Sequence, residues 1–138
     1  MMPLVRFGVS IEQELLARFD REVVARGYVN RSEAIRDLIR ERLVQEEWRG
    51  GEEVVGVITL VYDHHVRGIE ARLTEIQHQH HPQVLSTMHV HLDHDNCLEV
   101  VAVKGEGERI AELAAKLIGI KGVRHGRLTA TTTGRRLK

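Results

Sequence analysis

The sequence predicts an α+β protein made of two small domains, and three observations support this fold class. Residues 5–11 alternate apolar and polar side chains, a pattern typical of a half-buried strand. Apolar residues then recur at helical spacing over residues 12–26 and from residue 30 to about 46. Beyond a polar, glycine-bearing stretch at 48–53, strand-like and helix-like segments alternate as far as residue 131.

This alternation predicts the division of the chain. Residues 1–47 form an N-terminal strand–helix–helix domain, 48–53 a linker, 54–131 a second domain, and 132–138 a polar, flexible tail. In a chain of 138 residues each domain is very small, so association with other copies would help both to bury a core.

The predicted strand at 5–11 has no partner within its own domain, so its backbone groups must pair with another copy of the chain. Two such strands, antiparallel across a twofold axis, form a ribbon that fits the major groove of B-DNA. The apolar side chains then face the dimer core, and the outward positions hold Arg6, Gly8 and Ser10. An edge strand with a solvated face is the alternative, and the strand taken alone favours it.

Capping residues and a glycine predict the ends of both helices. Ser10 and Gln13 have the spacing of a capping box, and Gly27 ends the first helix. Asn30, followed by Glu33, begins the second helix.

Composition excludes some classes of protein and points to one kind of ligand. With 42% hydrophobic and 29% charged residues, the chain is globular, and its lack of signal-peptide or membrane-span character predicts a cytoplasmic protein with no membrane partner. Residues 1–50 carry nine arginines and nine acidic residues, so charge alone does not indicate a nucleic-acid partner. One cysteine excludes an internal disulfide, and eight of the nine histidines lie between His64 and His94, which indicates metal binding.

The second domain is predicted from the order of its elements. The β-branched run from Val54 to Val61 predicts a buried strand, and Ile69, Leu73 and Ile76 predict a helix that ends before the proline at position 82. Strands at 84–93, 97–104 and 122–131 and a helix at 106–119 complete the domain. This βαββαβ order is the ferredoxin-like (ACT-like) split βαβ pattern.

The central hairpin of this domain predicts a metal site from the alternation of its side chains. Apolar residues at 88, 90, 92, 98, 100 and 102 are expected to face the core. His89, His91, Cys97 and Glu99 must then share the other face, where two imidazoles and a thiol suit a late first-row divalent metal. Taken singly, each is better explained as a surface histidine or a small buried cysteine. The helix offers a fourth ligand, and the residues leave open whether it is His78, His80 or His81.

Two segments resemble the DNA-binding half of the nickel-responsive NikR family: Arg6-Phe7-Gly8-Val9-Ser10 and Gly27-Tyr28-Val29-Asn30-Arg31-Ser32-Glu33-Ala34-Ile35-Arg36-Asp37. The likeness covers nearly the whole chain and implies a ribbon-helix-helix domain that binds palindromic half-sites in double-stranded DNA, within a homotetramer that is a dimer of dimers. It implies base reading by Arg6 and Ser10 and phosphate contacts at the start of the second helix, from Asn30, Arg31 and Ser32. Gly8 lacks a side chain where some relatives have threonine, which leaves the operator sequence open.

The segments Gln77-His78-Gln79-His80-His81 and Met88 to Cys97 are similar to the nickel site of the same family. The resemblance implies one Ni(II) per subunit, bound by His89, His91 and Cys97 of one chain and by His78 of its neighbour. It also implies that Glu99 contacts a ligand histidine, although a solvated carboxylate is nearly as good an explanation. The same donors arranged tetrahedrally would suit zinc.

Two further features have roles that the resemblance implies. Glu33 and Asp37 would help to hold a second cation between the domains, with a solvated charged face as the alternative. His64, His65 and Arg67 would form a loop that approaches DNA phosphates or binds extra metal, although Val66 replaces a basic residue of some relatives. His94 is explained equally well as a turn residue.

The function predicted from these features is nickel-responsive repression of nickel-uptake genes. A metal chaperone or store would account for the histidines but not for the unpaired strand. Repressors that respond to another divalent metal, or to none, are further alternatives. A metal hydrolase is least expected, because four protein ligands leave no open coordination position, so the chain is predicted not to be an enzyme.

Overall fold

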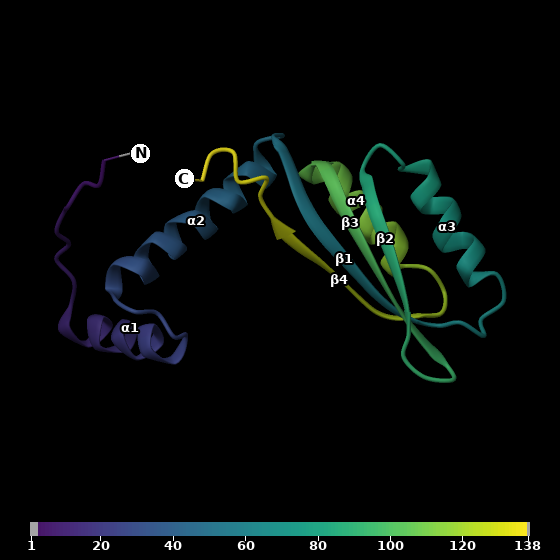
Figure 1. Cartoon of the computed structure of the whole chain (residues 1–138), viewed down its shortest axis with the longest axis horizontal. Helices are drawn as coiled ribbons and strands as arrows, with labels where there is room; N and C mark the ends of the chain where they lie inside the picture. Colours follow the sequence, from purple (N-terminus) through teal and green to yellow (C-terminus); the bar gives the residue numbers. More distant parts are fainter. Residues whose placement is uncertain (1–2, 138) are drawn as a thin grey trace. The chain divides into compact units, whose positions relative to one another are not determined.

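The computed structural model describes residues 3–137, which form two compact units with a boundary between Glu41 and Arg42. The first unit contains α1 (Gln13–Ala25) and the start of α2 (Arg31–Arg49), and the second contains the end of α2 and a four-stranded sheet with two further helices (Figure 1). No helix in the described part of the chain has the length and apolar character needed to span a membrane.

The ends of α1 and α2 confirm one predicted cap and correct another. Asn30 caps α2 as predicted, because its Oδ1 accepts a hydrogen bond of 2.9 Å from the backbone N–H of Glu33. The capping box predicted at Ser10 and Gln13 is wrong, since Glu12 stands at the N-cap of α1 and no side chain caps it. Gly27, at φ +76°, ends α1 as predicted.

The predicted ribbon strand is not formed in the single chain. Within the described residues, 3–12 contain no strand, and Val5, Phe7 and Val9 are 84%, 72% and 67% exposed. Leu38, on α2, is 60% exposed as well. Apolar side chains as exposed as these cannot stabilise a unit of this size, which agrees with the expectation that a second copy supplies the missing core.

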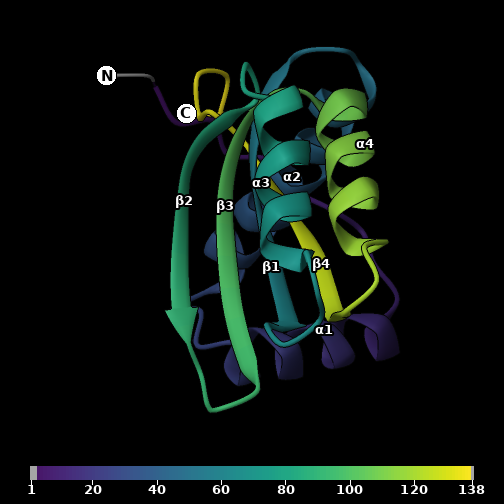
Figure 2. The ribbon, with the colours of Figure 1, turned by 90° about the vertical axis from the view of Figure 1, so that its right-hand side faces the viewer.

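The second unit confirms the predicted ferredoxin-like order. Its elements are β1 (Glu53–Asp63), α3 (Ile69–Gln79), β2 (Val84–His91), β3 (Asn96–Glu106), α4 (Gly107–Ile118) and β4 (Val123–Thr131). The strands form one antiparallel sheet in the order β2-β3-β1-β4, and α3 and α4 lie side by side on one of its faces (Figure 2). We call this the covered face and the opposite one the open face. The core fills the space between the covered face and the helices, with Leu60, Tyr62, Leu73, Leu113 and Leu117 among its fully buried side chains.

The end of α2 and the C-terminal segment are more ordered than the sequence predicts. α2 continues to Arg49 instead of residue 46, so the linker predicted at 48–53 shrinks to Gly50-Gly51-Glu52. The cause is Trp48, whose indole Nε1 donates a hydrogen bond of 2.8 Å to the carbonyl of Thr131. The tail predicted to be flexible contacts the same region, because Thr132 Oγ1 donates to the buried Glu47 carboxylate at 2.9 Å. Lys138, its last residue, lies outside the described residues.

Candidate metal centre

The hairpin of β2 and β3 places the predicted metal ligands on the covered face of the sheet. The strand register pairs His89 with Glu99 and His91 with Cys97, which confirms that the four residues share one face. The prediction that this face points away from the core is wrong, because Cys97 and Glu99 are buried.

The face assignment failed because β3 is an interior strand with apolar residues on both sides. Val101 and Val103 continue the buried row of Cys97, and the predicted core residues at 98, 100 and 102 are only half-buried on the open face. Met88, on the edge strand β2, is 56% exposed. Alternation identifies which residues share a face, but on such a strand it cannot tell which face the helices cover.

Two of the predicted ligands already stand at a distance that suits one ion. His91 Nδ1 lies 3.4 Å from Cys97 Sγ, and the rings of His89 and His91 have centroids 5.7 Å apart. Donors bound at zinc-like distances of about 2.0 Å for nitrogen and 2.3 Å for sulfur would be roughly 3 to 3.6 Å apart on the same ion. The donor set of two imidazoles and one thiol therefore fits a divalent metal without movement of the His91–Cys97 pair.

Two buried groups hold His89 from below. The hydroxyl of Tyr62 lies 2.8 Å from His89 Nε2, and Glu99 Oε1 lies 3.8 Å from its Nδ1. Burial raises the pKa of Tyr62 far above its usual range, and the negative charges of Cys97 and Glu99 add to the shift. Burial also raises the pKa of Glu99, while the nearby Gln77 amide and His89 oppose that shift. Glu99 thus contacts a ligand histidine, as predicted for it.

Tyr62 and Gln77 are contacts that the sequence analysis missed. Tyr62 is the cross-strand partner of Cys97 in the register of β1 and β3, so it lies beside the metal ligands on the covered face. Gln77 follows Leu73 by one helical turn and is therefore a polar residue at the end of the inward stripe of α3. A polar residue that continues an apolar helical stripe was the signal available for Gln77, and the pairing of Tyr62 could not be known without the register.

The three helix histidines do not join this group in the single chain. His78 and His81 are exposed, with ring centroids 6.1 Å apart, and His80 Nε2 lies 3.3 Å from Nζ of Lys116 on α4. Among the described residues, the one group of three or more acidic, histidine or cysteine side chains close enough to share an ion does not contain His78.

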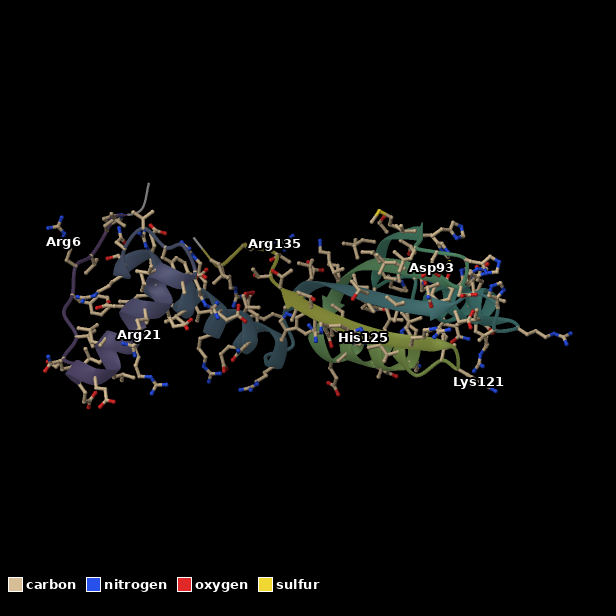
Figure 3. The ribbon with its side chains drawn as sticks, turned by 90° about the horizontal axis from the view of Figure 1, so that it is seen from below. Arg6, Arg21, Asp93, Lys121, His125 and Arg135 are labelled. Carbon is tan, nitrogen blue, oxygen red and sulfur yellow. The ribbon has the colours of Figure 1, made fainter. Side chains whose placement is uncertain are left out.

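That group lies where the β1–α3 loop meets the β2–β3 turn and consists of His65, His94 and Asp95. His65 Nε2 is 3.3 Å from Asp95 Oδ1, and His94 Nδ1 is 3.2 Å from the same oxygen. The two loops are fixed against each other because the N–H of His64 donates to the carbonyl of Asp95 at 3.1 Å. Asp93 stiffens the turn by accepting hydrogen bonds from the N–H groups of residues 95 and 96, which lower the pKa of its carboxyl (Figure 3). His94 is thus more than a turn residue, and Arg67 is not part of this group.

The predicted DNA-contacting residues are exposed. Arg6 lies on the N-terminal segment with its guanidinium directed away from the helices of its unit (Figure 3), and Gly8 and Ser10 are exposed on the same segment. Arg31 is also exposed but makes a bidentate ion pair with Asp20 of α1, with both N–O distances at 2.8 Å.

The two acidic residues predicted to hold a second cation have partners within their own unit. Glu33 pairs with Arg36 one turn later on α2, and Asp37 accepts a hydrogen bond from the hydroxyl of Tyr28. Both carboxylates are therefore already engaged in the single chain.

Comparison with known proteins agrees with both halves of this picture. Residues 55–131 match the family described as the NikR C-terminal nickel-binding domain, and residues 5–46 match ribbon-helix-helix proteins of the copG family. A protein of Geobacter metallireducens assigned as a nickel-responsive regulator is 56% identical over 134 residues, which cover 96% of each chain. One from Solibacter usitatus with the same assignment is 56% identical and covers 100% of each chain, and one from Thermococcus onnurineus is 53% identical over 99% of each. This chain belongs to the NikR family.

The match to the NikR family confirms a ribbon-helix-helix domain followed by a nickel-binding domain. A solved structure, an uncharacterised protein of Thermotoga maritima, resembles the chain with a TM-score of 0.53 at 18% identity. It covers 59% of this chain and 100% of its own, and at this identity it supports the fold alone.

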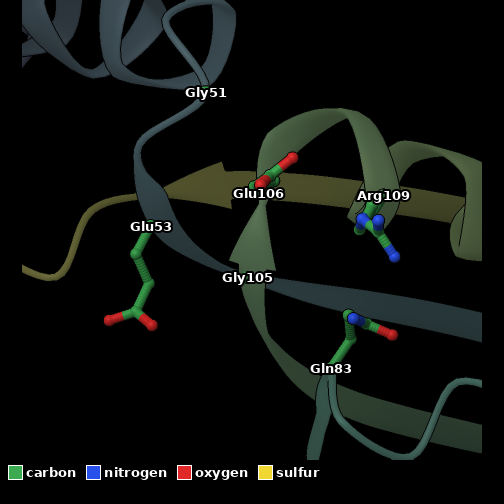
Figure 4. Close-up of a pocket in the computed structure, with 6 residues that line it drawn as sticks. All are labelled: Gly51, Glu53, Gln83, Gly105, Glu106 and Arg109. Carbon is green, nitrogen blue, oxygen red and sulfur yellow. The ribbon is translucent and has the colours of Figure 1, made fainter.

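One open cleft in this NikR-family chain lies away from the candidate centre. It has a volume of about 390 Å³ and is lined by Gly51, Glu53, Gln83, Gly105, Glu106 and Arg109 (Figure 4). These residues lie at the Glu106 end of β3, whereas Cys97 lies near the opposite end of that strand. The cleft therefore contains none of the predicted ligands.

Proposed function

We propose that this member of the NikR family is a nickel-responsive repressor that binds operator DNA when Ni(II) is bound. The observation that carries the proposal is the His91–Cys97 pair, whose donor atoms are 3.4 Å apart beside His89. These three residues supply two imidazoles and a thiolate, and His78 of a neighbouring subunit supplies the fourth donor. One Ni(II) per subunit follows from this ligand set.

The exposed position of His78 supports its assignment to a neighbouring subunit, because a ligand donated to another chain must be accessible in the single chain. A square-planar arrangement of three nitrogens and one sulfur suits Ni(II), and a tetrahedral one would suit zinc. When bound, the metal joins strand ligands of one subunit to a helix of another, so that its binding energy stabilises the assembly. Four protein ligands leave no position for a substrate, which supports a regulatory and not a catalytic role.

The assembly that we propose is a tetramer made of two dimers. Its dimers form through the N-terminal segments, whose exposed Val5, Phe7 and Val9 become the core beneath a two-stranded ribbon. The open face of the sheet supports further association, because it carries Met88 at 56% exposure together with half-buried apolar residues of β1 and β3.

The DNA contacts that we propose come from two elements of each subunit. Arg6 and Ser10 read base edges from the ribbon, with Gly8 between them leaving the backbone close to the groove floor. The capped start of α2, at Asn30, Arg31 and Ser32, binds phosphate through its free N–H groups and the positive end of the helix dipole. The twofold symmetry of the ribbon requires an operator with palindromic half-sites.

Operator binding with and without metal tests the proposal. The full chain should bind operator DNA at least tenfold more tightly with Ni(II) than without metal, and less tightly with Zn(II) or Cu(II). His89→Ala should abolish the response to nickel, and His125→Ala is the matched control, because His125 is an exposed histidine on β4. Operator binding that ignores nickel would overturn the proposal, and strong nickel binding without any operator binding would favour a metal chaperone or store.

Two accessory roles remain part of the proposal. Glu33 and Asp37 would release their present partners to hold a second cation when the protein is on DNA. The loop of His64 and His65, together with His94 and Asp95, supplies imidazole and carboxylate donors for an additional divalent ion, and Arg67 beside it would approach phosphate. His94→Ala should then lower the number of Ni(II) ions bound at high metal concentration by one per subunit, and an unchanged number would exclude the additional ion.

A further inference from the structure

The side-chain amide of Gln77 joins the last turn of α3 to both strands of the metal hairpin. Its Oε1 accepts a hydrogen bond of 2.8 Å from Thr87 Oγ1 on β2, and its Nε2 donates to Glu99 Oε2 on β3 at 3.3 Å. Chemistry fixes this orientation of the amide, because an ionised carboxylate only accepts hydrogen bonds and must therefore face the NH₂ group. Reversing the amide would leave both contacts without a matching donor and acceptor.

Glu99 extends this connection to a metal ligand. It is only 6% exposed, and its other oxygen lies 3.8 Å from His89 Nδ1. A continuous path of polar contacts therefore runs from α3 through Gln77 and Glu99 to His89. The path lies at the covered face, where few water molecules could replace a lost contact, so a shift at one end must be felt at the other.

The other end of the path lies beside the ligand donated to a neighbour. Gln77 directly precedes His78, and α3 ends at Gln79, so the last helical turn has Gln77 as its final inward contact. His78 is exposed, with no hydrogen bond among the described contacts that fixes its ring. The direction of His78 therefore depends on how the last turn is held, and Gln77 is the group that holds it.

We propose that Gln77 is a positioning residue that couples two metal sites, the one on its own strands and the one that His78 completes in a neighbouring subunit. The inference rests on the proposed role of His78. Ordering of His89 and Glu99 at one site strengthens the Gln77 contact and fixes the last turn of α3, which presents His78 to the other site. By reciprocity, metal held by His78 stabilises the same contact and favours binding at the first site. Nickel binding is therefore cooperative between the two sites.

The test compares Gln77→Met with Gln79→Met in the full chain. Methionine keeps the length of the side chain and removes both hydrogen bonds, and Gln79 is an exposed glutamine in the same turn with no hydrogen bond in the described contacts. Ni(II) is titrated against a competing chelator, with the thiolate-to-nickel absorption band as a second signal. Gln77→Met should keep one Ni(II) per subunit, lose cooperativity and bind nickel about tenfold more weakly, on the scale of the two lost contacts. Gln79→Met should behave as the unchanged protein.

Hydrogen exchange of the metal-free protein provides a readout independent of nickel. The backbone amides of residues 77–81 should exchange about tenfold faster in Gln77→Met than in Gln79→Met, because the last turn loses its inward anchor. Equal exchange rates, together with unchanged affinity and cooperativity, would overturn the inference.

His78→Ala separates failure of this inference from failure of the proposed function. If His78 is not a ligand, His78→Ala binds nickel as tightly as the unchanged protein, and the proposed ligand set is wrong. If His78 is a ligand and Gln77 acts through it, Gln77→Met should weaken nickel binding much less in the His78→Ala background than alone. A loss of the same size in both backgrounds would mean that Gln77 acts only on its own His89, which would overturn the coupling while leaving the proposed function intact.

Discussion

The hydroxyl of Tyr62 lies 2.8 Å from Nε2 of His89 and joins the buried end of β1 to a histidine on the edge strand of the sheet. Tyr62 is fully buried, and the burial that raises its pKa keeps the hydroxyl protonated at any pH at which the protein functions. A protonated hydroxyl can donate to Nε2, which then carries no proton. Nδ1 becomes the nitrogen left for the metal once its own proton is displaced.

Tyr62→Phe should therefore weaken nickel binding roughly tenfold to a hundredfold, the usual effect of removing a partner that orients a ligand histidine. The substitution removes one oxygen and leaves the packing of the ring unchanged, so thermal unfolding of the metal-free protein should shift only slightly. The measurement is competition for Ni(II) with a chelator of known affinity. Tyr28→Phe is the control, because Tyr28 is the other tyrosine of the chain and its hydroxyl contacts Asp37. Tighter nickel binding in Tyr62→Phe would show that the hydroxyl competes with the metal for Nε2.

Much of the second unit could be predicted from the sequence because its signals are local. The β-branched run of β1, the helical stripe of Ile69 and Leu73, and the alternation along β2 and β3 each act within a few residues. The pairing of His91 with Cys97 was likewise accessible, because a tight hairpin sets the register and alternation then sets the shared face.

The contacts that were missed depend on segments far apart in the chain. Tyr62 reaches His89 across 27 residues, Gln77 reaches Glu99 across 22, and Trp48 reaches Thr131 across 83. No local pattern encodes such contacts. The ribbon strand at 5–11 differs again, since its pairing was inferred from the lack of a partner and the single chain leaves it unformed.

The neighbouring side chains of Phe7 and Arg6 should separate assembly from DNA recognition. Phe7, 72% exposed in the single chain, is placed on the core side of the ribbon, and Arg6 on its outer side. Phe7→Ser should dissociate the N-terminal dimer and with it abolish operator binding, because the ribbon loses a large part of its core. Arg6→Ala should keep the assembly and weaken operator binding about tenfold, on the scale of one lost bidentate base contact. Sedimentation measures the first effect and operator titration the second, and a Phe7→Ser protein with unchanged assembly would contradict the ribbon.

The docking of Trp48 should make Gly107 intolerant of any side chain. A Cβ at Gly107 would stand 2.6 Å from the carbonyl oxygen of Trp48 and 2.8 Å from its Cε3. Gly107→Ala should therefore destabilise the second unit by about 1 to 3 kcal/mol, the cost of forcing a packed contact apart. Thermal or urea unfolding measures it, and Gly8→Ala is the control because a Cβ there meets nothing within 4 Å. Equal stability of the two variants would mean that the end of α2 does not rest on α4 in solution.

The ion pair between Asp20 and Arg31 should restrain DNA binding in the free protein. The hydrogen bond from Arg31 lowers the pKa of Asp20 below its ordinary value of 3.8, so any stabilisation from the pair is complete above 3.8 and is lost only as the pH falls through the lowered value. At neutral pH Asp20 is thus ionised, holds the guanidinium and repels phosphate near the start of α2. Asp20→Asn should release Arg31 and tighten DNA binding about twofold to fivefold, within the small range expected of an exposed pair. Because phosphate contacts do not read sequence, the gain should be the same for operator and for unrelated DNA. Glu22→Gln, which removes the same charge from an exposed pair with Arg26 on α1, is the control and should leave affinity nearly unchanged. A carboxyl titration of Asp20 followed by NMR should move back towards 3.8 in Arg31→Ala, and an Asp20→Asn protein that binds DNA more weakly would show that the pair orients Arg31 for phosphate instead of withholding it.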